Sequence, residues 1–330
     1  MTDSVPLVEL WRGEFLESVH AGHAVISDGS GTVVEAWGNA DAVILPRSSV
    51  KMIQALPLAT SEAGRGLSTR QLAFACASHD GAALHTNQAL KWLEDLGLAE
   101  SDLRCGPQLP ADHKARRDLI CSDGAPNQTH NNCSGKHCGF LMLNQHLGGD
   151  AEYVDPSHPV QRAVRDAFEE VTGENSPGFG IDGCSAPNFA TTMTGLARAM
   201  SRFASAREGS GAMADAMVRL HGAMALHPDL VAGEGRACTE LMRAMDGRVA
   251  IKTGAEGVYT AMIPERGLGI AVKISDGATR AAECVIAALL VRLGVLAPDH
   301  PATLRRMDAP LVNRRGIDCG AIRPVQGLWP

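Results

Sequence analysis

Two short motifs, far apart in the chain, contain residue types that could perform nucleophilic catalysis. The first is "SSVK" at 48–51, which opens an apolar stretch that predicts a helix over 49–60. Residues i and i+3 share a helix face, so Ser48 and Lys51 would lie together. The positive end of the helix dipole and burial both disfavour a charged ammonium, and a neutral lysine is a general base beside a serine. A capping serine with a surface lysine is the simpler alternative for so short a string.

The second motif is "KTG" at 252–254, at the end of a predicted strand. An early Ser-x-x-Lys with a late Lys-Thr-Gly is the signature of serine β-lactamases and penicillin-binding proteins, and the order here agrees with theirs. A polar residue from the helical part usually completes such a site. The string "CASHDG" offers Ser78 and His79, just after a helix expected over 68–77, although both would also suit an ordinary helix end.

A third cluster combines thiols with nitrogen bases. Its members are Cys133, Lys136, His137 and Cys138 in "NNCSGKHCGF", with Asp182 and Cys184 in "IDGCSAPNF". Two cysteines and a histidine can bind zinc, but the spacing matches no common zinc motif. On this cluster alone, a helix start with buried thiols is the simpler interpretation.

The elements that must position these residues change character along the chain. Strand-like runs occur near the start and again in "RVAIKTG", "GVYTAMIPE" and "LGIAVKI". Further helices are expected over 84–96, 134–147, 158–172, 188–205, 212–225, 236–245 and 277–293. The stretch 98–132, rich in Pro, Gly, Asp and Asn, is expected to be irregular, and the tail after about 298 to be surface chain.

This order of elements predicts an α/β (α+β) fold. One mainly antiparallel sheet would be built from both termini, flanked by helices and interrupted by a helical insert. We expect a single domain over 1–330, with its sheet part at about 1–47 and 246–330 and its helical part at about 48–245.

Composition narrows the functional classes. The 330 residues carry a net charge of −7, which argues weakly against nucleic acid and anionic membranes as partners. The start, "MTDSVPLVELWRGEFLE", has no signal-peptide pattern, and the longest apolar run contains Arg292 and is too short to span a bilayer. The nine cysteines are therefore expected to be thiols, metal ligands or core residues in a cytoplasmic protein.

Taken together, the motifs resemble one family. The strings "PRSSVK", "CASHD", "NNCSGKH", "IDGCSAPNFA", "HPDLVAGEGRACTELM", "IKTGAEGVY" and "GIAVKISDGATRA" are similar, in order, to the third class of bacterial L-asparaginases, the Rhizobium etli type. The resemblance covers residues 47 to about 280. It implies a fold like that of serine β-lactamases and glutaminases, and hydrolysis of L-asparagine to L-aspartate and ammonia.

The resemblance also implies the catalytic set. Ser48 with Lys51 and Ser78 with Lys252 would form two serine–lysine pairs around one amide. We expect Ser48 to attack the amide carbon and Lys51 to take its proton, while the second pair passes a proton to the leaving nitrogen.

A zinc site of two cysteines and a lysine follows from the same resemblance, with one ion per chain. Its ligands fall on Cys133, Lys136 and Cys184, and Cys138 has no assigned role. A lysine ligand must be deprotonated, and the metal itself would favour that state.

The substrate-binding positions that we expect are Arg47, His137, Asp182, Gly254 and Ala255. Arg47 is a candidate for the α-carboxylate and Asp182 for the α-ammonium, with a surface arginine and a turn aspartate as alternatives. The amides of Ser48 and Ala255 could hold the oxyanion.

The expected partner is a small molecule, L-asparagine, and the expected assembly is a homodimer that binds neither nucleic acid nor membrane. Alternatives stay open. A glutaminase or a β-lactamase-like acyl-serine hydrolase shares the motifs, and a non-catalytic amino-acid-binding or zinc-binding protein would use the same polar residues without chemistry.

Overall fold

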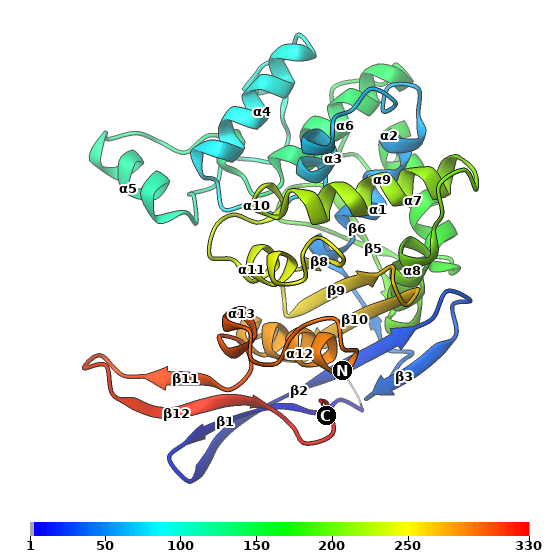
Figure 1. Ribbon diagram of the computed structural model, residues 1–330. Helices are drawn as coiled ribbons and strands as arrows, with labels where there is room; N and C mark the ends of the chain where they lie inside the picture. The colour runs from blue at the N-terminus through cyan, green and yellow to red at the C-terminus, as the bar shows by residue number, and fades with distance from the viewer. Residues whose placement is uncertain (1–2, 330) are drawn as a thin grey trace. The chain divides into compact units, whose positions relative to one another are not determined.

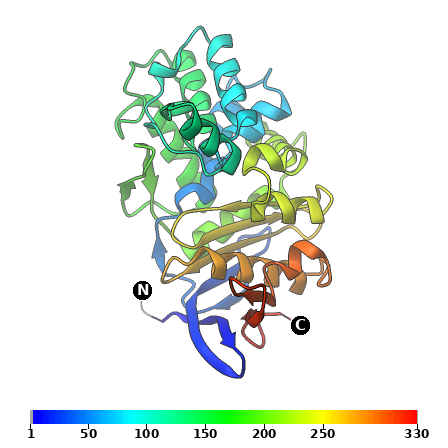
Figure 2. The same cartoon turned by 90° about the vertical axis from the view of Figure 1, so that its left-hand side faces the viewer.

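The computed structural model describes residues 3–329, which divide into two compact units (Figures 1 and 2). The first unit holds the chain up to Ser49, Thr191–Ser205 and the chain from Glu240 onwards. The second holds Val50–Ala190 and Ala206–Thr239. Residues 191–205, which lie within the range expected for the helical part, thus group with the sheet. The two units are described separately.

The first unit is built on an eight-stranded antiparallel sheet in the order β11-β12-β1-β2-β10-β9-β8, with β3 also paired to β2 (Figure 1). Its strands are β1 (Val5–Arg12), β2 (Phe15–Ser27), β3 (Val33–Trp37), β8 (Ala250–Thr253), β9 (Val258–Ile263), β10 (Leu268–Ile274), β11 (Ala309–Val312) and β12 (Asp318–Pro324). N-terminal β1 and β2 lie between C-terminal β12 and β10. The predicted mixed fold, with an antiparallel sheet from both termini, is confirmed.

The tail after residue 298 was expected to be surface chain, and this was wrong. Strand β12 joins the sheet beside β1, with Leu10 opposite Ile322. The pairing had no local signal, because a sheet partner some three hundred residues away leaves no periodicity in the tail itself.

The centre of the sheet is covered on both faces. All residues of β9 and all but the first of β10 are buried. Helices α8 (Met193–Ser205) and α12 (Thr279–Arg292) both pack against these two strands. A Cβ at Gly269 would lie 2.1 Å from the backbone nitrogen of Ser201, so α8 can approach β10 this closely only over a glycine. The remaining short elements of this unit are β4 (Val43–Ile44), β7 (Thr191–Thr192) and α13 (Pro301–Leu304).

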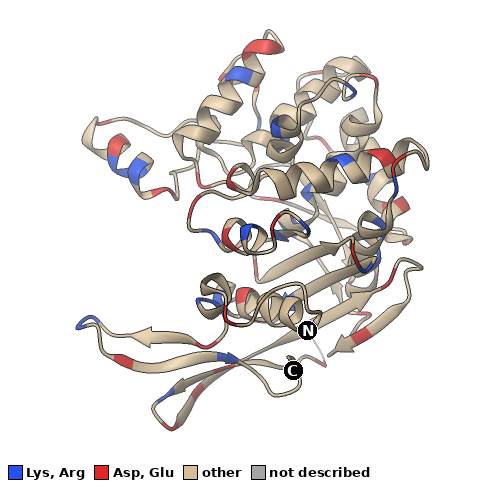
Figure 3. Ribbon diagram, in the orientation of Figure 1, with Lys and Arg blue, Asp and Glu red and all other residues tan. Residues whose placement is uncertain are grey.

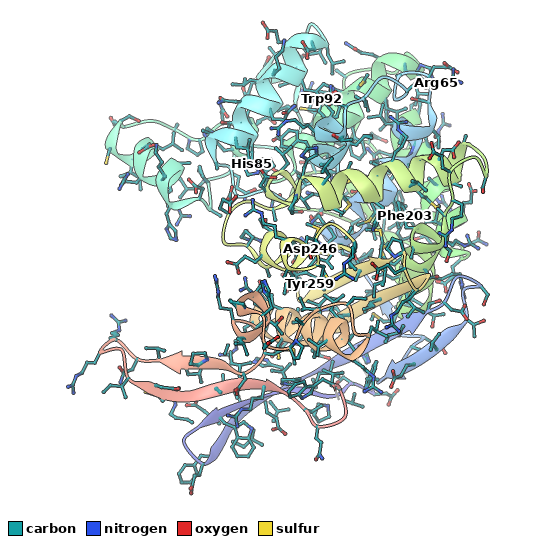
Figure 4. The ribbon with its side chains drawn as sticks, in the orientation of Figure 1. Arg65, His85, Trp92, Phe203, Asp246 and Tyr259 are labelled. Carbon is teal, nitrogen blue, oxygen red and sulfur yellow. The ribbon has the colours of Figure 1, made fainter. Side chains whose placement is uncertain are left out.

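The second unit is mainly helical. Its elements are α1 (Lys51–Gln54), α2 (Leu56–Thr60), α3 (Thr69–Ala75), α4 (Ala83–Asp95), α5 (His113–Cys121), α6 (Ser134–Leu147), α7 (Pro159–Thr172), α9 (Ala212–Leu226), α10 (Pro228–Val231), β5 (Phe179–Ile181), β6 (Pro187–Phe189) and the 3-10 turns Glu100–Asp102 and Gln128–His130; α11 (Ala237–Ala244) includes residues of both units. Trp92, from α4, is fully buried in this unit's core (Figure 4).

Several expected helices differ in their bounds. The one predicted over 134–147 matches α6, whereas the one predicted over 188–205 begins only at Met193, after two short strands. The stretch 98–132 is not irregular throughout, because it contains α5 and two 3-10 turns.

Charged side chains of both signs are interspersed along the elements of each unit (Figure 3). Among residues 3–329, no helix combines the length and the apolar character that crossing a bilayer requires.

Candidate active site

Ser48 lies in a tight turn. Residues Arg47–Val50 form a 3-10 turn that runs directly into α1, in place of the first part of the helix expected over 49–60. Lys51 is the first residue of α1, so the eclipsed spacing of 3-10 geometry does not extend to it, and the pairing of Ser48 with Lys51 stays a prediction. Arg47 enters the turn with a φ of 55°, a left-handed conformation that costs a non-glycine residue about 1–3 kcal/mol.

Within the first unit, this turn packs against the end of β8. The hydroxyl of Thr260 donates a hydrogen bond to the carbonyl oxygen of Ser49, 3.0 Å away, from the strand beside β8. A Cβ at Gly254 would lie 2.7 Å from the Pro46 carbonyl oxygen and 3.2 Å from the Ser49 nitrogen. Glycine at this position therefore allows the Lys-Thr-Gly motif to lie against the turn of Ser48, which is about 200 residues earlier in the chain. Lys252, two residues before Gly254 on β8, is fully buried, and its Nζ donates to the Thr253 carbonyl at 2.8 Å.

In the second unit, Lys51 is fully buried and hydrogen-bonded to Ser78. Its Nζ lies 2.9 Å from Ser78 Oγ, 2.5 Å from the Ala77 carbonyl oxygen and 3.4 Å from the Asn132 carbonyl oxygen. The expected pairs set Ser48 with Lys51 and Ser78 with Lys252, so contact between Lys51 and Ser78 is a feature that the sequence did not indicate. It brings a base within direct reach of a second hydroxyl.

The loop that carries Ser78 is fixed by backbone and side-chain contacts. The Ser78 amide donates to the Val231 carbonyl at 2.8 Å, and the His79 amide donates to the Asn132 carbonyl, which also accepts from Lys51. The ring of His79 accepts from the Gly81 amide at Nδ1, so Nε2 carries the proton and donates to the hydroxyl of Ser134. His79 thus serves to hold the loop.

Asp80 anchors the same loop from the other side. Its carboxylate accepts from the Ala82 amide and lies 3.1 Å from Nδ1 of His85, whose ring stacks on that of His79 (Figure 4 labels His85). Burial raises the pKa of Asp80, but its contacts with His85 and with the Ala82 amide outweigh this effect and leave the pKa below its usual value. A Cβ at Gly233 would lie 2.1 Å from the carboxylate, so that residue must be glycine.

The three expected metal ligands lie together in the second unit. Lys136 Nζ is 3.0 Å from Cys184 Sγ, and the thiol of Cys133 donates to Asn132 Oδ1 at 2.9 Å and interacts with Cys184. Each of the three side chains is about 3% exposed. Two sulfurs and one nitrogen in mutual contact are the donor set that zinc accepts, so these residues fit the metal. Among the described residues, no three His, Cys, Asp or Glu side chains form such a group, because the third donor here is a lysine.

The charges in this group are coupled. The hydrogen bond from Cys133 is the largest effect that lowers the pKa of Cys184; burial opposes it and Lys136 reinforces it. The same hydrogen bond, with burial, raises the pKa of Cys133. Burial lowers the pKa of Lys136, but the attraction of Cys184 and Cys133 outweighs it, so the net direction is upward. The thiol of Cys184 and the amine of Lys136 thus each favour the charged form of the other.

Cys138 is not part of this group. Its thiol points to the Ala89 carbonyl, 3.9 Å away, and burial raises its pKa. A helix turn past Cys133 and two residues past Lys136, it faces α4 and belongs to the core.

His137 lies in a fully buried network that includes a residue overlooked in the sequence. Tyr153 accepts a hydrogen bond from the Arg104 amide, so its hydroxyl donates to His137 Nδ1, 2.9 Å away. The ring proton of His137 must then be on Nε2, which has no hydrogen-bond partner within residues 3–329. A buried, unpartnered donor favours a ligand atom. Tyr153 could have been noticed in the sequence only as one of two tyrosines.

Asp182 lies on a tight turn between β5 and β6, half-buried, two residues before Cys184. Its amide donates to the Ala186 carbonyl, and its charge acts on Lys136 and Cys184. The turn therefore holds a carboxylate beside the sulfur–nitrogen group. Ala255 lies in the exposed loop after β8, and its amide makes no hydrogen bond within the described chain.

These features define a mixed α/β protein whose buried polar residues include a lysine–serine contact and a cysteine–lysine group. The family model described as L-asparaginase II matches residues 8–324, nearly the whole chain. The chain therefore belongs to the L-asparaginase II family. No curated protein sequence matches it.

Solved structures with similarity to the chain share little sequence with it. Mglu "in its tris and glutamate form" is 12% identical with a TM-score of 0.47, over 84% of this chain and 60% of that one. A putative beta-lactamase from Bacteroides dorei DSM 17855 is 12% identical with a TM-score of 0.41, over 78% and 87%. A beta-lactamase from Mycobacterium bovis is 13% identical with a TM-score of 0.38, over 79% and 89%. The chain thus spans about 60% of that Mglu chain.

The contacts of Asp80 predict a pH-dependent loss of stability. At pH 7, Asp80→Asn should lower the free energy of unfolding by about 1–3 kcal/mol, since it removes charge-assisted hydrogen bonds in a buried setting. The pKa of Asp80 is lowered by folding, so the stabilisation is complete above the unfolded value of about 3.9 and is lost as pH falls through the lower folded value. Urea unfolding at pH 7, 5 and 3 measures this.

The matched control is Asp95→Asn, which removes an exposed carboxylate that pairs with Lys91 at 2.7 Å. Its effect should stay within about 0.5 kcal/mol at each pH, as for other exposed ion pairs. A deficit for Asp80→Asn that is equally large at pH 3 would contradict the assignment.

Proposed function

We propose that this protein is an amidohydrolase that cleaves the side-chain amide of L-asparagine to give L-aspartate and ammonia. The observation that carries the proposal is the fully buried Lys51, three residues after Ser48 and 2.9 Å from Ser78, in a chain of the L-asparaginase II family. A buried amine beside a hydroxyl suits the activation of a serine nucleophile. The resemblance to the third class of bacterial L-asparaginases favours asparagine over other amides.

In the proposed acylation, Ser48 Oγ attacks the amide carbon as its proton passes to neutral Lys51. The carbon–nitrogen bond breaks, the nitrogen takes up a proton and leaves as ammonia, and the substrate remains as a β-aspartyl ester on Ser48. Water then attacks the ester, its hydroxyl completes L-aspartate, and its other proton returns to Ser48 Oγ. Ser78 and Lys252 would carry the proton to the leaving nitrogen.

The surroundings of Lys51 suit such a base. A neutral amine has two N–H donors and one lone pair. In the structure Lys51 Nζ donates to the carbonyls of Ala77 and Asn132 and to the hydroxyl of Ser78. The two carbonyls would keep the two N–H groups of a neutral amine, and its lone pair would then face the hydroxyl. In this arrangement the hydroxyl nearest to the lone pair is that of Ser78, so Ser78 is the second candidate for the nucleophile, with Lys51 as its base.

The substrate's charged groups need partners of each sign. We assign its α-carboxylate to Arg47 and its α-ammonium to Asp182. The buried Nε2–H of His137 is a donor for a substrate oxygen, and the amides of Ser48 and Ala255 would hold the oxyanion.

We also propose that Cys133, Lys136 and Cys184 hold one zinc ion, with water as a fourth ligand. When bound, the ion supplies a positive charge that orders its neighbours. The mutual contacts of the three side chains support the donor set. Binding would displace the proton from Lys136 and fix the turn that carries Asp182. The serines already provide a nucleophile, so we assign the site a positioning role.

The first prediction concerns substrate choice. We expect kcat/KM for ammonia release to be about 10–200-fold higher with L-asparagine than with L-glutamine, because one methylene is worth about 1–3 kcal/mol in a fitted pocket. Coupled measurement of kcat/KM for both amides tests this. Equal values would point to a broader amidase, turnover of nitrocefin to a β-lactamase-like hydrolase, and no ammonia from either amide to a binding protein.

The second prediction concerns the nucleophile. Ser48→Ala and Lys51→Met should each lower kcat by orders of magnitude, and the double variant should lose little more, because the two act as a unit. Lys51→Arg should fail as well, since guanidinium stays protonated. Ser49→Ala is the control, because Ser49 Oγ donates to the Pro46 carbonyl and takes no part in the proposed chemistry.

Peptide mass spectrometry after trapping with an electrophilic asparagine analogue identifies the acylated serine. The adduct should fall on Ser48 and vanish in Ser48→Ala. An adduct on Ser78 that persists in Ser48→Ala would transfer the role to Ser78, with Lys51 as its base.

The third prediction concerns the metal. Freshly purified protein should contain about one zinc per chain, and Cys184→Ser should contain far less, because two thiolates dominate the binding energy. Cys138→Ala is the matched control, since it removes an equally buried thiol outside the group and should keep the zinc. Elemental analysis makes the comparison. Wild-type protein with well under one equivalent would contradict the site.

A further inference from the structure

A second buried lysine supports the loop that follows the Lys-Thr-Gly motif. Lys273 lies on β10, is 7% exposed, and donates hydrogen bonds from Nζ to the carbonyls of Glu256 at 2.5 Å and Ile274 at 2.7 Å. Glu256 is the residue directly after Ala255. One ammonium therefore joins the tip of the loop to the neighbouring strand.

The register of the sheet places this lysine on the same face as Lys252. Lys252 is opposite Thr260, and Thr260 is opposite Ala271 on β10. Lys273 is two residues further along β10, and alternate residues of a strand point to the same face. The face that carries the proposed catalytic lysine thus carries a second buried amine.

The loop itself is strained and needs this support. Glu256 has a φ of 58°, which is unfavourable for a residue other than glycine. The Gly254 amide closes the loop on the Val258 carbonyl at 2.7 Å, and the Ile274 amide holds the Gly257 carbonyl at 2.9 Å. Lys273 and the Ile274 amide thus hold the carbonyls of two successive loop residues, Glu256 and Gly257. The Ala255 amide makes no hydrogen bond within the described chain.

Placing an ammonium here is costly. Burial lowers the pKa of Lys273, opposed by the charges of Glu256 and Asp276. Transferring an unpaired charge out of water is unfavourable, and hydrogen bonds to a charged donor offset part of that cost. Two backbone carbonyls therefore offset the cost only when the loop keeps this conformation, so the charge and the loop conformation depend on each other.

We propose that Lys273 is a positioning residue that fixes the 254–257 loop and so aims the Ala255 amide at the oxyanion. The assignment rests on the function proposed above. Lys273 touches no reacting atom; it acts through the peptide groups of Glu256 and Gly257. Because an oxyanion donor works in the transition state, a loosened loop should reduce kcat more than it changes KM.

The test compares Lys273→Met, which keeps the length and loses the charge and donors, with Val272→Ala. Val272 is the buried neighbour on the opposite face of β10, so the control creates a cavity in the same strand without touching the loop. Lys273→Met should lower kcat about 10–100-fold with KM within about threefold of wild type. Val272→Ala should lower the melting temperature and leave kcat within about twofold.

Hydrogen exchange provides a readout that does not depend on activity. The amides of Gly254 and Ile274, which close the loop, should exchange at least about tenfold faster in Lys273→Met than in Val272→Ala. Unchanged exchange, or a kcat for Lys273→Met within about threefold of wild type, would overturn the proposal. If wild-type protein releases no ammonia from either amide, the proposed function fails, and the exchange rates still decide whether Lys273 fixes the loop.

Discussion

The site depends on a buried amine that is held by backbone carbonyls. Lys51 lies with no exposed surface between the carbonyls of Ala77 and Asn132 and the hydroxyl of Ser78. An amine without these partners would be too costly to bury, so the loops that provide them must keep their conformation. His79 donates to the hydroxyl of Ser134 and Asp80 accepts from the Ala82 amide, so both side chains help to keep the Ser78 loop in its conformation. The polar network is thus as much a structural requirement as a chemical one.

Glycines decide how closely the backbone segments of the site approach one another. Gly254 lets the end of β8 contact the turn of Ser48, and Gly233 leaves room for the Asp80 carboxylate. At each position a Cβ would lie 2.7 Å or less from a backbone or carboxylate oxygen, which is too close for any residue other than glycine. Arg47 and Glu256 lie on either side of the contact between turn and strand, and both have positive φ values that are unfavourable for residues other than glycine. Strain at both ends of that contact is compensated by the sheet that surrounds it.

In the group formed by Cys133, Lys136 and Cys184, the attraction between charges opposes the cost of burying them. Cys133, Lys136 and Cys184 are buried together, and the low pKa of Cys184 and the raised pKa of Lys136 sustain one another. A charged pair of this kind contributes little net stability because of its desolvation cost. Its presence beside Asp182 and His137 is explained better by a ligand or metal than by the needs of the core, and this is the reasoning behind the zinc proposal.

The sequence by itself determined the local elements and the chemical inventory. Apolar periodicity located α6 and the strands β8 to β10, because each of these signals lies within a few residues of the chain. Short motifs and the resemblance to one family pointed to Ser48, Lys51, Ser78 and Lys252. Only the tertiary structure decided the partners. It joined Lys51 to Ser78, Tyr153 to His137, Lys273 to the loop after β8, and β12 to β1. Such contacts connect residues from 16 to more than 300 positions apart, and their energies depend on burial and on complete hydrogen bonding, neither of which a local pattern encodes.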